Sequence, residues 1–213
     1  MSLFTTTALV TTALTAGTGL VVLALATRTR RVQRLDDLLE EHVGPRRPGL
    51  RRVAGAATLA GEKFVHPVIA AVTSGALFLT RPGPPLRFVL PLAGASLGGI
   101  VAHHLVKVVY HRPRPAVALL RDKSEAAFPS GHTTNATAVM TTSAFILVRE
   151  GLVPLPVAVV GVIVLCLATG LSRVALGWHW GTDVLGGWMA GIGIAALACA
   201  WYETLPAVNS LLR

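Results

Sequence analysis

The chain is largely apolar, and most of the polar residues that such a composition would not lead one to expect gather in three short stretches. They are Lys107-Val-Val-Tyr-His-Arg-Pro-Arg114-Pro115, then Pro129-Ser130-Gly131-His132, and then a segment with Ser172-Arg173, His179 and Asp183. Phosphoryl transfer needs cations around the nonbridging oxygens, backbone N–H donors, an in-line nucleophile and an acid for the leaving group. Because the three stretches contain all of these parts, they predict a phosphate-handling catalytic region over residues 107–183.

The positive charges are expected to come from Lys107, Arg114 and Arg173. Arginine presents a planar fork to two phosphate oxygens at once, whereas lysine acts as a point charge. Ser130 and Gly131 stand where a helix is expected to begin, so free N–H groups and the positive end of the helix dipole can hold an anion there. Gly131 also removes a side chain that would keep a phosphate away from the backbone.

The spacing of His179 and Asp183 indicates a catalytic pair. Residues four apart share one face of a helical first turn, so the carboxylate can hydrogen-bond the imidazole. A carboxylate on one ring nitrogen fixes the tautomer and leaves the other nitrogen free to attack phosphorus. His132, which belongs to a different expected helix, is then available to protonate the departing oxygen.

The rest of the chain predicts an all-α integral membrane protein that holds these residues. Of its 213 residues 53% are hydrophobic and 14% are charged, against roughly 25% charged residues in an ordinary soluble domain. Apolar runs predict a six-helix bundle in one membrane domain, 1–213, with spanning helices at 6–27, 58–80, 86–110, 132–149, 152–171 and 184–204. Alternation of six spans puts the longer polar connections, and every candidate catalytic group, at one membrane face.

Residues 30–43 predict an amphipathic helix that lies in the membrane interface. Its apolar residues recur at helical spacing, with arginines, aspartates and glutamates between them. A solvated helical connector is the alternative interpretation. The formal net charge of +9 calls for anionic partners, and since the basic residues stand at the ends of apolar runs we expect membrane lipids and a lipid phosphate substrate, not nucleic acid.

The three stretches resemble the signature motifs of the type 2 phosphatidic acid phosphatase superfamily. Those motifs run lysine, six residues, Arg-Pro; then Pro-Ser-Gly-His; then Ser-Arg, five residues, His, three residues, Asp, and all three match here without a substitution. The resemblance implies a phosphohistidine on His179 and protonation by His132, without a metal or other cofactor, in a six-helix membrane bundle. It assigns phosphate binding to Lys107, Arg114, Ser130, Gly131 and Arg173.

Other polar residues near these stretches have competing interpretations. His103 and His104 stand one helical turn before Lys107, as bundle residues or as residues that line the pocket. Glu62, Lys63 and His66 form either a helix-terminal salt bridge or a contact to the substrate headgroup. Three more bases, Arg112, Arg121 and Lys123, are interpreted as anchors at the membrane surface. Since no cysteine or carboxylate cluster joins the histidines at ligand spacing, we expect no catalytic metal.

The function that this resemblance implies is removal of phosphate from a membrane lipid. The substrate could be a polyprenyl diphosphate, phosphatidylglycerol phosphate, phosphatidate or a polyprenyl-phosphoryl sugar phosphate. Two alternatives are a vanadate-dependent haloperoxidase-like enzyme, which the membrane setting disfavours, and a noncatalytic lipid-binding or transport protein, which the intact His179 and His132 disfavour.

The catalytic groups could face either the cytoplasm or the outside of the cell, and two observations favour opposite sides. With six spans, 15 of the 19 Lys and Arg residues lie on the catalytic face, which favours the cytoplasm by the positive-inside rule. Many bacterial members of the resembled family face outward. We predict a plasma (inner) membrane protein with an extracytoplasmic site, and the cytoplasmic face is the alternative.

Overall fold

The computed structural model describes residues 6–44, 48–62, 64–81, 84–119 and 126–205. Within these ranges every regular element is helical, so the predicted all-α class is confirmed. The elements are α1 (Thr6–Ala26), α2 (Arg30–Val43), α3 (Pro48–Ala57), the 3₁₀ turn η1 (Thr58–Gly61), α4 (Val65–Thr80), α5 (Leu86–Val109), α6 (Ala116–Leu119), α7 (Gly131–Arg149), α8 (Leu155–Ala175) and α9 (Gly181–Thr204).

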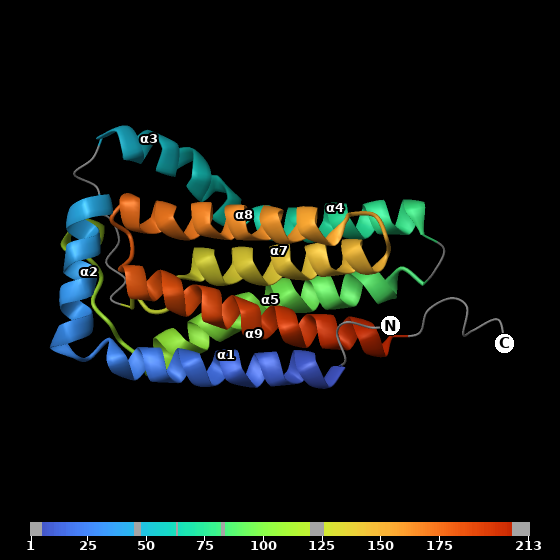
Figure 1. Ribbon diagram of the computed structural model, residues 1–213, viewed down its shortest axis with the longest axis horizontal. Helices are drawn as coiled ribbons and strands as arrows, with labels where there is room; N and C mark the ends of the chain where they lie inside the picture. The colour runs from blue at the N-terminus through green and yellow to red at the C-terminus, as the bar shows by residue number, and fades with distance from the viewer. Residues whose placement is uncertain (1–5, 45–47, 63, 82–83, 120–125, 206–213) are drawn as a thin grey trace.

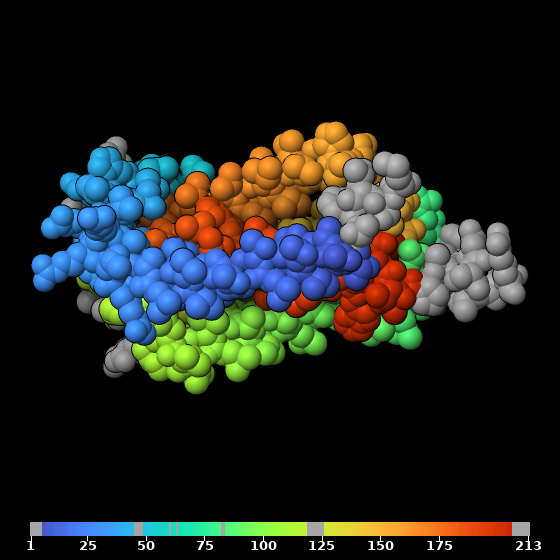
Figure 2. Space-filling view, turned by 60° about the horizontal axis from the view of Figure 1, so that its bottom comes forward, coloured from blue at the N-terminus to red at the C-terminus, as the bar shows by residue number. Residues whose placement is uncertain are grey.

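The long helices α1, α4, α5, α7, α8 and α9 run side by side, while α2 crosses one end of the bundle and α3 slants toward α4 at the same end (Figure 1). Figure 2 shows α1 lying along α9 on the outer face of the molecule. Leu14, Val21, Val22 and Leu25 of α1 are exposed, as expected of side chains that meet lipid. The crossing helices therefore mark the end of the bundle where the polar connections gather.

Helix α7 occupies the middle of the bundle and packs against α4, α5, α8 and α9. Most of its side chains are buried, although many are threonines. The hydroxyls of Thr134 and Thr142 donate hydrogen bonds to the backbone carbonyls one helical turn earlier. Because neighbouring helices shield α7 from lipid, it does not need an apolar surface.

The six predicted spanning helices are confirmed only in part, because not all of the observed helices are long and apolar enough to cross a membrane. Four helices in the described ranges are long and apolar enough to cross a membrane, namely α1, α5, α8 and α9. Helix α4 is apolar but has only 16 residues, and α7 is too rich in hydroxyls to qualify. The chain is a membrane protein with these four candidate spans.

One predicted helix is divided in the structure, and two others begin or end a few residues from the predicted positions. Residues 58–80 do not form one helix, because η1 ends at Gly61 and the extended residue Glu62 precedes α4. A Cβ at Gly61 would lie 2.7 Å from Thr169 Cγ2, so the chain turns where it presses against α8. Helix α8 continues to Ala175 instead of ending at 171, and α9 begins at Gly181 instead of 184.

The helix predicted over residues 30–43 is confirmed as α2, but its faces differ from the expectation. Leu35 and Leu38 are exposed, as an interface helix requires. Asp36, one of the polar residues between the apolar positions, is buried with 3% of its surface exposed. A charged side chain of α2 therefore points into the protein.

The opposite end of the bundle is closed by a polar cluster. Arg87 at the start of α5 donates to the hydroxyl of Tyr202 at 2.9 Å and lies 3.3 Å from Glu150. Tyr202 in turn donates to Glu150. These contacts join the beginning of α5 to the end of α9 and to Glu150, which follows α7, and pair three polar side chains far from the crossing helices.

Candidate active site

A tight turn at the end of α8 positions His179. The backbone carbonyl of Arg173 accepts the N–H groups of Trp178 at 2.9 Å and His179 at 3.3 Å. Such a turn requires a residue in the left-handed region, and Gly177 supplies it with φ of 73°. The interval of five residues between Arg173 and His179 is therefore the length of one helix-terminating turn.

The beginning of α9 positions Asp183. One carboxylate oxygen, Oδ2, accepts the N–H of Trp180 at 2.9 Å, so Asp183 caps the helix that carries it. The same oxygen lies 3.5 Å from Nδ1 of His179. That separation exceeds an ordinary hydrogen bond, and hydrogen bonds of catalytic groups commonly tighten in the reacting complex. His179 precedes α9, so the expectation that both residues share one helical face is wrong, and the capping turn brings them together instead.

Arg112 holds the other oxygen of the same carboxylate. Its Nη1 lies 2.6 Å from Asp183 Oδ1, and its Nη2 lies 2.6 Å from Asp36 Oδ2. Although burial opposes its charge, these two carboxylates raise the pKa of Arg112 above its ordinary value. Its interpretation as a surface anchor is wrong, because only 7% of the residue is exposed and both ends of its fork are paired inside the protein. Arg121 and Lys123 lie outside the described residues.

Burial sets the protonation state of His179. The residue is 3% exposed, and burial lowers the pKa of its imidazole to about 4 although Asp183 favours the charged form. The ring is therefore neutral near pH 7 and keeps a free electron pair. Since Nδ1 faces Asp183, Nε2 is the nitrogen left to attack an electrophile.

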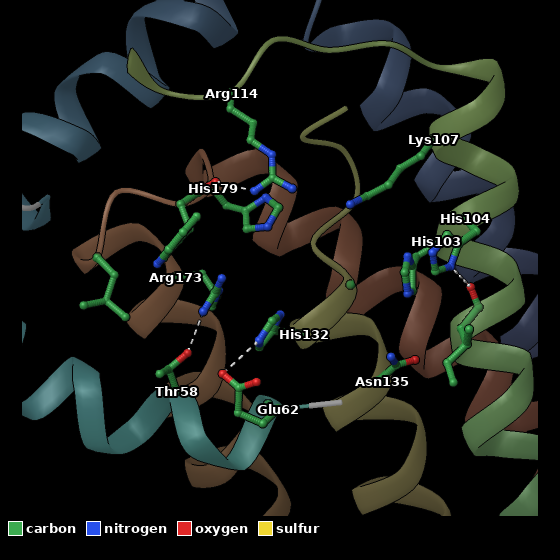
Figure 3. A pocket seen from close by; sticks show the side chains of 15 residues that line it. Thr58, Glu62, His103, His104, Lys107, Arg114, His132, Asn135, Arg173 and His179 are labelled. Carbon is green, nitrogen blue, oxygen red and sulfur yellow. Dashed lines mark hydrogen bonds and ion pairs between the residues drawn. The ribbon is translucent and has the colours of Figure 1, made fainter. Parts of the chain in front are cut away.

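His179 opens onto a cavity of about 620 Å³ at the end of the bundle that α2 crosses. Figure 3 shows Lys107, Arg114, Arg173 and the two histidines His132 and His179 directed toward one another across it. Arg173 is steadied by Thr58, whose hydroxyl accepts from Nη1 at 2.7 Å. The cavity is lined by Thr58, Gly61, Glu62, Ile100, His103, His104, Lys107, Arg114, Gly131, His132, Asn135, Arg173, Leu176, Trp178 and His179.

His132, at the beginning of α7, is paired with an acid. Its Nε2 lies 3.4 Å from Oε1 of Glu62 (Figure 3). The sequence predicted for Glu62 either a helix-terminal salt bridge or a contact to the substrate headgroup, and the structure brings it into the cavity beside this histidine. Of its expected companions, His66 is buried in α4 outside the cavity lining, and Lys63 lies outside the described residues.

The two histidines of α5 differ in their roles. His103 is buried and its ring packs on Gly131, where an added Cβ would lie 3.0 Å from the ring. Gly131 is therefore needed for this close approach as well as for access to the backbone. His104 is exposed, lines the cavity and has Nδ1 2.8 Å from the carbonyl of Ile100.

The structure does not bring Ser130 into the cavity. Its N–H donates to the carbonyl of Asp183 at 3.0 Å, and its hydroxyl accepts from Thr133 at 2.9 Å. Ser130 is fully buried and joins the beginnings of α7 and α9. Asn135 lines the cavity and was missed, although it lies three residues after His132 on the same helix face.

Taken together, four candidate spans and a cavity with two opposed histidines among three cationic side chains define a membrane-bound phosphatase. The described residues contain no group of three or more His, Cys, Asp or Glu that could hold a metal ion. The family model of the PAP2 superfamily matches residues 88–206, and the chain belongs to this superfamily.

Relatives of known activity agree with this assignment. Phosphatidylglycerophosphatase B of Bacillus subtilis (strain 168) is 32% identical over 81% of this chain and 85% of its own length. Undecaprenyl-diphosphatase BcrC of the same organism is 34% identical over 60% of this chain and 65% of its own. Decaprenylphosphoryl-5-phosphoribose phosphatase of Mycobacterium tuberculosis (strain ATCC 25618 / H37Rv) is 35% identical over 71% of this chain and 80% of its own.

A solved structure shares the whole fold. The crystal structure of a transmembrane PAP2-type phosphatidylglycerolphosphate phosphatase from Bacillus subtilis matches with a TM-score of 0.77 and 28% identity. The match covers 92% of this chain and 98% of that one. The protein is a multi-pass membrane lipid phosphatase, as the motifs predicted.

The turn that holds His179 can be tested with two glycines. Gly177→Ala and Gly151→Ala each force alanine into the left-handed region, with φ of 73° and 69°, at a cost of about 1–2 kcal/mol each. Both should lower the thermal unfolding midpoint in detergent. Only Gly177→Ala should also lower kcat per folded enzyme, by about tenfold or more, because displaced catalytic groups are costly. Equal kcat in the two variants would show that the turn does not position His179.

Proposed function

We propose that the protein hydrolyses its lipid phosphate substrate through a phosphohistidine on His179. The observation that carries this proposal is the pair of histidines from different elements that face one cavity, with Asp183 behind one and Glu62 beside the other. Lys107, Arg114 and Arg173 can surround the nonbridging oxygens of a phosphoryl group between the two rings. Positioning and charge stabilisation of this kind are the main sources of rate enhancement in phosphoryl transfer.

The reaction then has two balanced steps. Nε2 of His179 bonds to phosphorus while the bond from phosphorus to the leaving oxygen breaks, and His132 gives that oxygen a proton. Asp183 stabilises the positive charge that the substituted imidazole acquires. A water molecule then attacks phosphorus and passes a proton to His132, the bond to Nε2 breaks, and inorganic phosphate leaves.

The two histidine roles predict different responses to the leaving group. His132→Ala should slow hydrolysis of a lipid phosphate by about 10²–10⁴-fold, because general acid catalysis is lost. With p-nitrophenyl phosphate, whose leaving group needs no proton, it should still give a burst of about one nitrophenolate per enzyme. His179→Ala should give no burst with that substrate, and a burst from it would exclude His179 as nucleophile.

The residues on the leaving-group side of the cavity favour one class of substrate among those named for the relatives. In-line attack by His179 puts the departing oxygen beside His132, whose neighbours there are Glu62 and Asn135. A carboxylate repels a second phosphate but accepts hydrogen bonds from hydroxyls. We infer that the substrate is a phosphate monoester on a hydroxyl-bearing headgroup, such as phosphatidylglycerol phosphate or a polyprenyl-phosphoryl sugar phosphate, in preference to a polyprenyl diphosphate.

Glu62→Gln tests this preference directly. The wild type should have the higher kcat/KM with phosphatidylglycerol phosphate than with undecaprenyl diphosphate. The variant should narrow that ratio several-fold, because the repulsion of the leaving phosphate is removed. Glu41→Gln is the matched control, since it removes an exposed charge of α2 that does not line the cavity. If both kcat/KM values fall while their ratio stays constant, Glu62 acts only through His132 and does not select the substrate.

For the membrane arrangement we propose one domain of six spans, in which α4 and α7 join the four apolar helices and α2 lies in the interface. We propose that the catalytic end faces outward. The charge count that favours the cytoplasm includes Lys107, Arg112, Arg114 and Arg173, whose charges face the cavity or buried carboxylates. Without these four residues, 11 Lys and Arg residues (15 − 4) still lie on the catalytic face against four on the other, so the positive-inside rule keeps the cytoplasmic face as the alternative.

Cysteine labelling of intact cells tests the orientation. His111→Cys at the catalytic end should react with a membrane-impermeant maleimide without lysis, because residue 111 is exposed. Leu152→Cys at the opposite end should react only after lysis. The native Cys166 and Cys199 are buried and give the background. The reverse pattern would place the site in the cytoplasm.

A further inference from the structure

We propose that Asp36 of the crossing helix α2 is a positioning residue for the catalytic pair and acts on Asp183 through Arg112. This inference rests on the roles proposed above for His179 and Asp183. It gives α2 a function in catalysis besides its contact with the membrane.

Asp36 makes a full set of hydrogen bonds inside the protein. Its Oδ2 accepts from Arg112 Nη2 at 2.6 Å and from the hydroxyl of Thr182 at 2.6 Å. Its Oδ1 accepts the backbone N–H of Thr182 at 2.9 Å. Asp36 therefore caps the first turn of α9 from a different helix, one residue before the catalytic carboxylate.

Arg112 connects the two carboxylates through opposite arms of one guanidinium. Nη2 holds Asp36, while Nη1 holds both Asp183 and the hydroxyl of Thr182 at 2.6 Å. Because a guanidinium is planar and rigid, fixing one arm fixes the other. The position of Oδ1 of Asp183, and with it the direction of Oδ2 toward His179, depends on where Asp36 holds the arginine.

The charges of Asp36, Arg112 and Asp183 also support a positioning role for Asp36. A single arginine against Asp183 would cancel the negative charge that His179 needs when its ring becomes cationic. With Asp36 included, the two carboxylates and one guanidinium carry a net charge of minus one, and all three groups are at least nine-tenths buried. Buried ion pairs contribute little net stability compared with apolar packing, so a functional role accounts for this cluster better than a stabilising one.

The packing of α2 fits a positioning role. A Cβ at Gly181 would lie 2.3 Å from Leu39 Cδ2 and 3.4 Å from Asp36 Oδ1, so α2 rests directly on the first residue of α9. The next residue of α2, Asp37, is exposed. The two adjacent aspartates thus differ in burial and in contact with Arg112 and Thr182.

The test compares Asp36→Asn with Asp37→Asn in detergent, with kcat and KM measured per folded enzyme. Asparagine keeps an oxygen for the N–H of Thr182 but removes the charge that holds Arg112. We expect kcat of Asp36→Asn to fall about tenfold while KM stays within about twofold, a smaller loss than the roughly 10⁴-fold that follows neutralisation of a triad carboxylate. Asp37→Asn should match the wild type.

Arg112→Lys is the second variant, and it keeps the charge but cannot bridge both carboxylates. It should lose kcat as Asp36→Asn does, and Asp36→Asn added to it should cost little more. Wild-type kcat in either variant, or a loss confined to the unfolding midpoint, would overturn the proposal. His179→Ala and Asp183→Asn are assayed in parallel. If these two remain active, the proposed catalytic pair itself is wrong, whereas their inactivity beside a fully active Asp36→Asn rejects only the role of Asp36.

Discussion

Asp183 is a carboxylate with no exposed surface, and a charge in that position must be surrounded by donors. Its two oxygens are held by the N–H of Trp180 and by Arg112, and the same side chain faces His179. Each partner comes from a different part of the chain. The turn after α8, the first turn of α9, the connection after α5 and, through Arg112, helix α2 all converge on one carboxylate, so the geometry of the site depends on satisfying it.

The remainder of the fold supplies surroundings in which this arrangement is stable. Apolar helices such as α1 and α8 present their side chains outward. The polar helix α7 is enclosed and can carry His132 and Asn135 into the cavity without exposing hydroxyls to lipid. Glycines at 61, 131 and 181 permit the close contacts that bring η1, α5 and α2 against the elements bearing catalytic groups. The protein thus separates a membrane-compatible surface from a hydrophilic end.

The site residues could be predicted because their spacing reflects local turns. The interval from Arg173 to His179 is one helix-ending turn, and that from Trp180 to Asp183 is one helix-capping turn. Hydrophobic runs likewise located the long helices, because lipid requires them. The partners of Asp183 could not be predicted this way, since Arg112 is 71 residues from it and 76 from Asp36. Such pairing depends on how helices pack, and α2 by itself gives no signal that one of its two aspartates turns inward.

Asp183 occupies the Nδ1 side of the His179 ring, and we infer that this leaves Nε2 to react. The most direct test is to trap the phosphoenzyme from wild-type protein under alkaline quench, where phosphohistidine survives, and to determine by mass spectrometry and ³¹P NMR which residue and which nitrogen carry phosphate. We expect phosphate on Nε2 of His179 in the wild-type protein, and no phosphate on the Asp183→Asn protein at the same quench time. Phosphate on Nδ1 of His179, or on any other residue, would contradict this inference.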